Sequence, residues 1–200
     1  MRLSLICPTM GRTTLQYLFD SVIPQLKLGD EFILVGDGPL PDEATALIAT
    51  YVTALPRLVR YIELPERVGD FGCTPCDAGI KAATGDAIFV IGDDDTIEPE
   101  AFATIKAALI KEPMVPHLFA MNHTTSVLKG TLQCGLVSSQ QIVVPRDMTK
   151  MPLMADVKPE EWHVSDHVWM MKVHLAWNER TMFHDEIIST LTSQNRGAFL

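Results

Sequence analysis

The chain has 200 residues, 47% of them hydrophobic and 20% charged, and its formal net charge is −9 because 25 Asp and Glu residues outnumber 16 Lys and Arg residues. This length suits one domain with a sizeable core, and the apolar content excludes a disordered chain. There is no apolar run of the ~20 residues that a membrane helix needs and no signal-peptide pattern, so we expect a cytoplasmic protein without a membrane segment. The acidic charge argues against broad binding to nucleic-acid backbones.

The first 112 residues predict alternating strands and helices. Short apolar runs closed by Pro or Gly are typical of buried strands, and apolar residues spaced by three and four predict helices. Thr13 or Thr14 is the expected N-cap of the first helix. This order predicts an α/β fold with a mostly parallel central sheet and helices on both faces. The expected strands are 3–7, 32–35, 58–62 and 87–91, and the expected helices are 15–26, 42–55, 77–83 and 99–111.

The pattern changes after Pro113. Three short apolar runs follow without intervening helices, and we interpret them as antiparallel or mixed additions to the sheet. A helix is expected over about 163–178, and the last twenty residues show no clear pattern. No linker divides the sequence, so residues 1–200 are predicted to form a single domain with a smaller, mixed C-terminal part. The three expected strands are 118–121, 131–134 and 141–144.

Three of the expected parallel strands end in polar, Gly- or Pro-containing segments, at 8–12, 36–38 and 92–95. Ligands of open α/β sheets bind outside the carboxyl ends of the strands, so these segments are expected to meet at one edge. The last contains Asp93-Asp94-Asp95. Adjacent carboxylates repel each other, and a hard cation such as Mg²⁺ or Mn²⁺ relieves that repulsion. The alternative is a polar turn that leads into a helix.

Other phosphate-binding classes fit poorly. There is no G-x-x-x-x-G-K-[ST], which excludes a P-loop NTPase, and no G-x-G-x-x-G after the first strand, which argues against a dinucleotide oxidoreductase. Asp93-Asp94-Asp95-Thr96 has its Thr one place too early for a haloacid-dehalogenase-type phosphatase. The Cys73-Thr74-Pro75-Cys76 segment has the spacing of a redox pair, but no second pair completes a zinc site, so we favour incidental or structural cysteines.

Four segments together resemble the GT-A-fold glycosyltransferases, especially the family 2 type. The segment 8–12 is similar to the Pro-Thr/Tyr-x-x-Arg start of that family, and 32–38 is similar to its strand ending in Asp-Asp-Gly. The segment 77–88 resembles Arg-Asn-x-Gly-Ile-x-x-Ala-x-Gly-Asp-x-Ile without the Arg, and 93–95 with Pro99 resembles the Asp-x-Asp element. The resemblance implies a Rossmann-like GT-A fold, with residues 1–112 as the nucleotide-sugar-binding half and 113–200 as the acceptor-side half.

The resemblance also implies a nucleotide-sugar donor whose diphosphate is bridged to carboxylates by Mn²⁺ or Mg²⁺. Asp37 would bind the nucleotide base, Asp95 would hold the metal, and Asp93 would contact the ribose or the metal. Alignment through Pro99 instead places Gly92 and Asp94 at the two Asp positions. The family Arg falls on Cys76, so Arg12 or Arg67 is expected to supply the positive charge. The further residues expected at the donor are Pro8, Thr9, Gly69, Asp70 and Asp77.

The second half is expected to supply the acceptor side. Ser165-Asp166-His167-Val168-Trp169 resembles the family pattern of a catalytic base at a helix start, with Ser replacing Glu, which implies Asp166 as the base. The alternative is that Ser165 or Asp166 caps the helix. His184 is a candidate third metal ligand, because neutral imidazole suits Mn²⁺.

The resulting expectation is a metal-dependent, inverting glycosyltransferase of the hexosyltransferase type. The acceptor is a saccharide, a protein or a modified nucleic acid, and the sequence does not choose among them. It does not predict the oligomeric state either. The alternatives are a non-catalytic module that binds a nucleotide sugar or a metal, and a nucleotidyltransferase.

Overall fold

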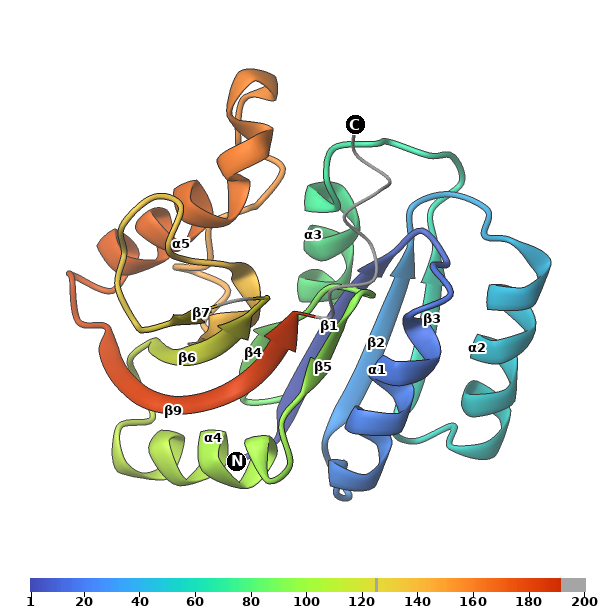
Figure 1. Cartoon of the computed structure of the whole chain (residues 1–200), viewed down its shortest axis with the longest axis horizontal. Coiled ribbons are helices and arrows are strands. Elements are labelled where there is room, and N and C mark those ends of the chain that lie inside the picture. The colour runs from blue at the N-terminus through green and yellow to red at the C-terminus, as the bar shows by residue number, and fades with distance from the viewer. Residues whose placement is uncertain (125, 192–200) are drawn as a thin grey trace.

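A computed structural model of the chain describes residues 1–124 and 126–191, without the side chains of residues 162 and 163. The first half alternates strands and helices as expected (Figure 1). Helix α3 begins four residues earlier than predicted. The elements are β1 (Leu3–Thr9), α1 (Leu15–Val22), β2 (Glu31–Gly36), α2 (Asp42–Ala54), β3 (Val59–Glu63), α3 (Cys73–Ala82), β4 (Ala87–Val90), β5 (Asp95–Ile97) and α4 (Ala101–Lys111).

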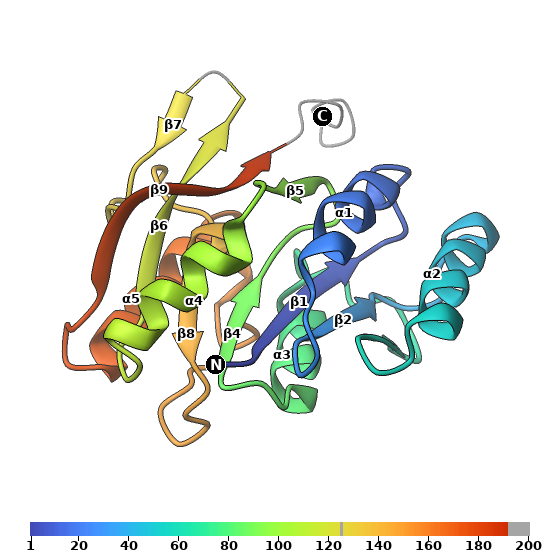
Figure 2. The ribbon, with the colours of Figure 1, turned by 90° about the horizontal axis from the view of Figure 1, so that it is seen from below.

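The second half adds strands and one long helix. Strand β9 is strongly curved: it pairs in parallel with β6 and in antiparallel with β5, which begins at the last Asp of the acidic run (Figures 1 and 2). A short 3₁₀ turn at Ser139–Gln141 precedes β8, and another at Pro159–Val164 precedes α5. The elements are β6 (His117–His123), β7 (Ser126–Leu128), β8 (Ile142–Pro145), α5 (Ser165–Ala176) and β9 (Met182–Leu191).

One sheet joins both halves within the described residues. Its strand order is β3-β2-β1-β4-β8-β6-β9-β5, with β7 paired to β6. The first four strands are parallel, and β8 is antiparallel to β4. The predicted parallel sheet with a mixed C-terminal part is therefore confirmed. In the same described part of the chain, none of the helices has the length and apolar character that crossing a membrane requires.

Two apolar layers cover the two faces of the sheet. Side chains alternate between faces along a strand, so Leu3 and Leu5 of β1 pack with α1, α2 and α4, whereas Ile6 packs with α3 and α5. Gly79 of α3 lies against Ile6, so a larger residue there would push the helix off the sheet. The parallel strands thus end together at one edge, between the helical layers.

Some local predictions are wrong. No strand forms at residues 131–134, which lack a pairing strand and lie half-buried or exposed on the surface. Strands β5, β7 and β9 were not predicted; β9 carries charged, exposed residues and depends on its pairing with β6. Thr14 precedes α1, as expected of an N-cap, but makes no side-chain cap. Its hydroxyl instead donates to the carbonyl of Asp93 at 2.8 Å.

Candidate functional site

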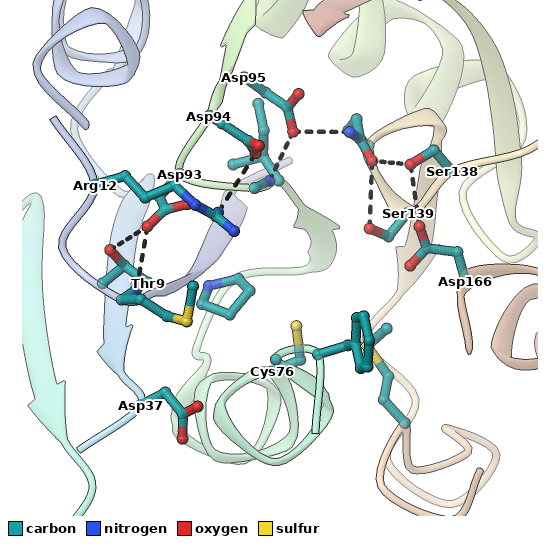
Figure 3. Close-up of a pocket in the computed structure, with 18 of the residues that line it drawn as sticks. Thr9, Arg12, Asp37, Cys76, Asp93, Asp94, Asp95, Ser138, Ser139 and Asp166 are labelled. Carbon is teal, nitrogen blue, oxygen red and sulfur yellow. Dashed lines mark hydrogen bonds and ion pairs between the residues drawn. The ribbon is translucent and has the colours of Figure 1, made fainter. Parts of the chain in front are cut away.

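The three polar strand ends meet in one cavity of about 300 Å³. The ends of β1, β2 and β4 form one side, and the 3₁₀ turn before β8 and the first turn of α5 form the other (Figure 3). The convergence expected from the strand order is therefore found. The expected site residues that line this cavity are Pro8, Thr9, Arg12, Asp37, Arg67, Gly69, Asp93, Asp94, Asp95 and Asp166.

Both carboxylate oxygens of Asp93 bind residues at the end of β1 and in the loop that follows it. Its Oδ2 accepts hydrogen bonds from the Thr9 hydroxyl at 2.7 Å and from the Met10 amide at 3.1 Å. Its Oδ1 pairs with the Arg12 guanidinium, and its side chain is 0% exposed. Asp93 therefore holds the guanidinium of Arg12 in place beside the cavity.

Asp94 is the acidic side chain of the run that is open to the cavity. Its carboxylate is 23% exposed, and its Oδ1 lies 3.7 Å from Nη1 of Arg12. Burial raises the pKa of Asp94, and the nearby Arg12 opposes that shift. Asp94 is therefore placed to meet a ligand, which is the position that alignment through Pro99 implied for it.

Asp95 is buried beneath the cavity. Its Oδ2 accepts hydrogen bonds from the Gly92 amide at 3.0 Å and from Nε2 of Gln140 at 2.7 Å. Its buried Oδ1 has no hydrogen-bond partner among the described residues. Burial, and secondarily the charge of Asp94, raises the pKa of Asp95 well above the usual range. An unsatisfied buried carboxylate oxygen is what a cation would stabilise.

The acidic run fits a divalent cation that shares its ligands with a phosphate. Within residues 1–124 and 126–191, no group of three or more His, Cys, Asp or Glu side chains could hold a metal ion. Mg²⁺ typically takes only one or two carboxylates and completes its shell with water and substrate phosphates. The partly exposed carboxylate of Asp94 and the unpartnered oxygen of Asp95 meet that smaller requirement.

His184 does not join this group. Because β9 pairs with β6, Nε2 of His184 lies 2.9 Å from Nδ1 of His117, and its ring stacks on Phe119 with centroids 4.4 Å apart. His184 does not line the cavity. The expectation that it is a third metal ligand is therefore not supported by its position.

Asp37 holds the loop after β3 over the cavity. Its carboxylate accepts hydrogen bonds from the amides of Val68 at 2.8 Å and Gly69 at 3.0 Å. Asp37 is buried but still lines the cavity. A carboxylate at the end of β2 thus sets the position of the loop after β3.

Asp70 and Asp77, both expected near the donor, support the structure instead. One carboxylate oxygen of Asp70 accepts hydrogen bonds from the amide and hydroxyl of Thr74, which stabilises the first turn of α3. Asp77 accepts the amides of Met154 at 2.8 Å and Ala155 at 2.9 Å, although burial raises its pKa. Neither residue lines the cavity.

Asp166 faces the acidic run across the cavity (Figure 3). Its Oδ2 lies 3.1 Å from the Ser138 hydroxyl, and the backbone and hydroxyl of Ser139 also donate to the carboxylate. Burial raises the pKa of Asp166, and these hydrogen bonds lower it in part. The N-cap of α5 is Val164, so capping does not account for Asp166.

Several residues of the cavity were not found from the sequence. The 3₁₀ turn connects the two carboxylate groups: Oε1 of Gln140 accepts the hydroxyl of Ser138, and Ser138 in turn reaches Asp166. A capping box of Ser138 and Gln141 marks the start of this turn, but only the three-dimensional position of the turn shows its part in the site. Phe71 and Cys76 also line the cavity, and Cys76 occupies the position of the missing family Arg.

The fold is shared with known nucleotide-sugar enzymes. A fragment of TarS from S. aureus, in complex with UDP-GlcNAc, is 17% identical with a TM-score of 0.74, and the match covers 97% of this chain and 59% of that one. The mannosyltransferase PcManGT from Pyrobaculum calidifontis, in complex with GDP-Man and Mn²⁺, is 15% identical with a TM-score of 0.75, covering 98% and 58%. This chain thus spans about 60% of their length.

No curated protein sequence matches this chain significantly. The low identities to TarS and PcManGT show the fold alone, and that fold is the GT-A fold expected from the sequence. A family model, described as glycosyl transferase family 2, matches residues 4–128 of the 200. That match spans β1 to β7, including the three strand ends and the acidic run. The protein therefore belongs to glycosyl transferase family 2.

Proposed function

We propose that this protein transfers a hexose from a nucleoside-diphosphate sugar to an acceptor hydroxyl, with inversion and with the help of Mn²⁺ or Mg²⁺. One observation carries the proposal. The partly exposed carboxylate of Asp94 and the unpartnered oxygen of Asp95 lie on one side of a single cavity, and the buried carboxylate of Asp166 lies on the other. The residues that we propose for the cation and for the base thus face one another in a family 2 chain. The TarS and PcManGT complexes with nucleotide sugars give further support.

On the donor side, Asp94 and Asp95 would hold the metal ion. The ion, when bound, neutralises charge that develops on the diphosphate leaving group. Arg12, fixed by Asp93, supplies a second positive charge at the same side of the cavity. Asp37 and Gly69, at the end of β2 and in the loop beside it, would border the nucleotide. The donor half proposed here is residues 1–112.

On the acceptor side, Asp166 would take the proton of the attacking hydroxyl. A carboxylate whose pKa is raised by burial is a stronger base than an exposed one, and general-base catalysis benefits from a pKa closer to the working pH. Ser138 and Ser139 fix the carboxylate orientation through their hydrogen bonds. Residues 113–200 would form this half, with a saccharide, a protein or a modified nucleic acid as the acceptor.

The proposal is tested by incubating the protein with UDP-, GDP- and dTDP-sugars and Mn²⁺ or Mg²⁺, and by measuring nucleoside diphosphate release. Asp166→Asn is expected to abolish release while nucleotide binding persists. The matched control is Asp185→Asn, because Asp185 lies outside the cavity with a 90% exposed side chain. Nucleotide binding without any release from the wild type would instead favour the non-catalytic module.

A further inference from the structure

Phe71 is a large apolar side chain at the cavity that the proposed chemistry does not use. It lines the cavity, yet 63% of its surface is exposed. Exposed single apolar residues are common, so exposure alone carries no conclusion. The backbone of Phe71 provides a second observation.

The φ angle of Phe71 is 58°, in the left-handed region. This region is unfavourable for a bulky L-residue, whereas Gly and Asn adopt it readily. Gly69 and Gly72, with φ angles of 72° and 85°, flank Phe71 in the same loop. A third glycine at position 71 would suit this backbone better, so Phe71 places its aromatic ring here at the cost of backbone strain. Strained residues of this kind cluster at ligand sites.

The loop is held at both ends, which keeps the ring beside the cavity. Asp37 binds the amide of Gly69, and Asp70 binds the amide and hydroxyl of Thr74 in α3. Within this frame, Phe71 has little freedom to relax its φ angle. Its ring is therefore an apolar surface at a fixed place beside a cavity that is otherwise rich in carboxylates.

We propose that Phe71 is a stacking platform for a hexose ring, and so a specificity-determining residue of the transfer reaction; this inference rests on the proposed function. A hexose has hydroxyl groups for the carboxylates and an apolar C–H face for an aromatic ring. The ring belongs to the donor or to a saccharide acceptor, and the chemistry of stacking is the same for both. Contacts between two aromatic rings correspond to a change of about 2- to 12-fold, and we expect an affinity change of similar size for the hexose.

The test compares Phe71→Asn with Phe71→Tyr. Asn tolerates the left-handed backbone without a ring, and Tyr keeps both the ring and the strain. We expect Phe71→Asn to melt at or above the wild-type Tm, whereas its sugar affinity falls about 2- to 12-fold. Phe71→Tyr should keep the wild-type affinity. Phe183→Asn is the control, because Phe183 is 50% exposed on β9 and does not line the cavity.

Two arms identify the source of the ring. In the donor arm, the affinity for UDP-GlcNAc or GDP-mannose is compared with the affinity for UDP or GDP, which gives the contribution of the hexose. If Phe71→Asn loses this contribution, the ring that stacks on Phe71 is the hexose of the donor. In the acceptor arm, saturation-transfer NMR measures the binding of methyl hexosides in the presence of UDP or GDP and Mg²⁺. If Phe71→Asn loses the signal of the methyl hexosides, the ring that stacks on Phe71 belongs to the acceptor.

Three outcomes would contradict the inference. Unchanged binding in both arms, with nucleotide binding intact in the wild type, overturns the stacking platform and leaves the proposed function standing. Absence of nucleotide binding in the wild type overturns the proposed function and the platform together. A lower Tm of Phe71→Asn, with unchanged sugar binding, assigns the ring to packing.

Discussion

Nε2 of Gln140 donates a hydrogen bond of 2.7 Å to Oδ2 of Asp95, and both side chains are buried. The same Gln140 accepts the hydroxyl of Ser138, which lies 3.1 Å from Asp166. One buried amide therefore links the carboxylates on the two sides of the cavity. Because a Ser hydroxyl has one proton, Gln140 competes with Asp166 for the hydrogen bond of Ser138.

Gln140→Met should weaken both the fold and the metal site. The change leaves Asp95 with the Gly92 amide as its remaining hydrogen-bond donor among the described residues, and a buried group that loses its partner costs about 1–3 kcal/mol. We expect a lower free energy of unfolding, measured by denaturant titration. We also expect weaker binding of Mn²⁺, so that activity requires a higher Mn²⁺ concentration in a Mn²⁺ titration. Gln133→Met, at an exposed position, is the control. Equal stability of the two variants would contradict the link.

Ser138→Ala should move the pH dependence of activity. Burial raises the pKa of Asp166, and the Ser138 hydroxyl lowers it in part. Removal of the hydroxyl therefore raises the pKa of Asp166 further, and a base works only when it is deprotonated. The acidic limb of kcat against pH should shift to higher pH. Ser126→Ala, at an exposed position of β7, should leave the limb in place. A shift to lower pH would contradict the assignment of Asp166 as the base.

Arg12→Ala should destabilise the protein far more than Arg2→Ala. Asp93 is 0% exposed and pairs with Arg12, so the variant leaves a buried carboxylate without its cation, at a cost of roughly 3 kcal/mol. The Arg2–Asp86 pair is exposed, and solvent screening makes such pairs contribute little to stability. Urea unfolding of both variants checks the difference. Similar losses in both would show that Arg12 is not the anchor of the loop.

The two stacked histidines should make the fold sensitive to mild acid. Burial lowers the pKa of both His117 and His184, so the unfolded chain binds protons more readily than the folded one. Stability is therefore lost as the pH falls below about 6.5, the ordinary histidine value. His117→Gln should lose less stability between pH 7 and pH 5 than the wild type, as measured by urea unfolding. An equal or steeper loss would contradict this account.

The site also predicts that His184 is dispensable for metal use. Its ring lies against His117 and Phe119 and does not line the cavity. His184→Gln should keep the wild-type dependence of activity on Mn²⁺ concentration. A variant that requires much more Mn²⁺ would restore His184 as a ligand.

The sequence predicted the donor half better than the acceptor half for physical reasons. Strands β1, β2 and β4 are buried apolar runs, and their polar ends must meet because parallel strands share an edge. Strand β9 depends on long-range pairing with β6, and its sequence alone carries no strand pattern.

The same distinction between local sequence pattern and long-range contact applies to single residues of the site. Asp37, Asp94 and Asp166 were expected at the cavity and line it. The supporting roles of Asp70 and Asp77 depend on which amides lie nearby, which spacing does not specify. Gln140 follows no motif, and only the turn before β8 brings its amide to Asp95.

The central claim is that the partly exposed carboxylate of Asp94 holds the cation of a nucleotide-sugar donor. The most direct measurement is the thermal shift produced by UDP- and GDP-sugars with Mn²⁺, in the wild type and in Asp94→Asn. The account predicts a Mn²⁺-dependent rise in Tm for the wild type and its loss in Asp94→Asn. An equal, Mn²⁺-dependent rise in both proteins would contradict it.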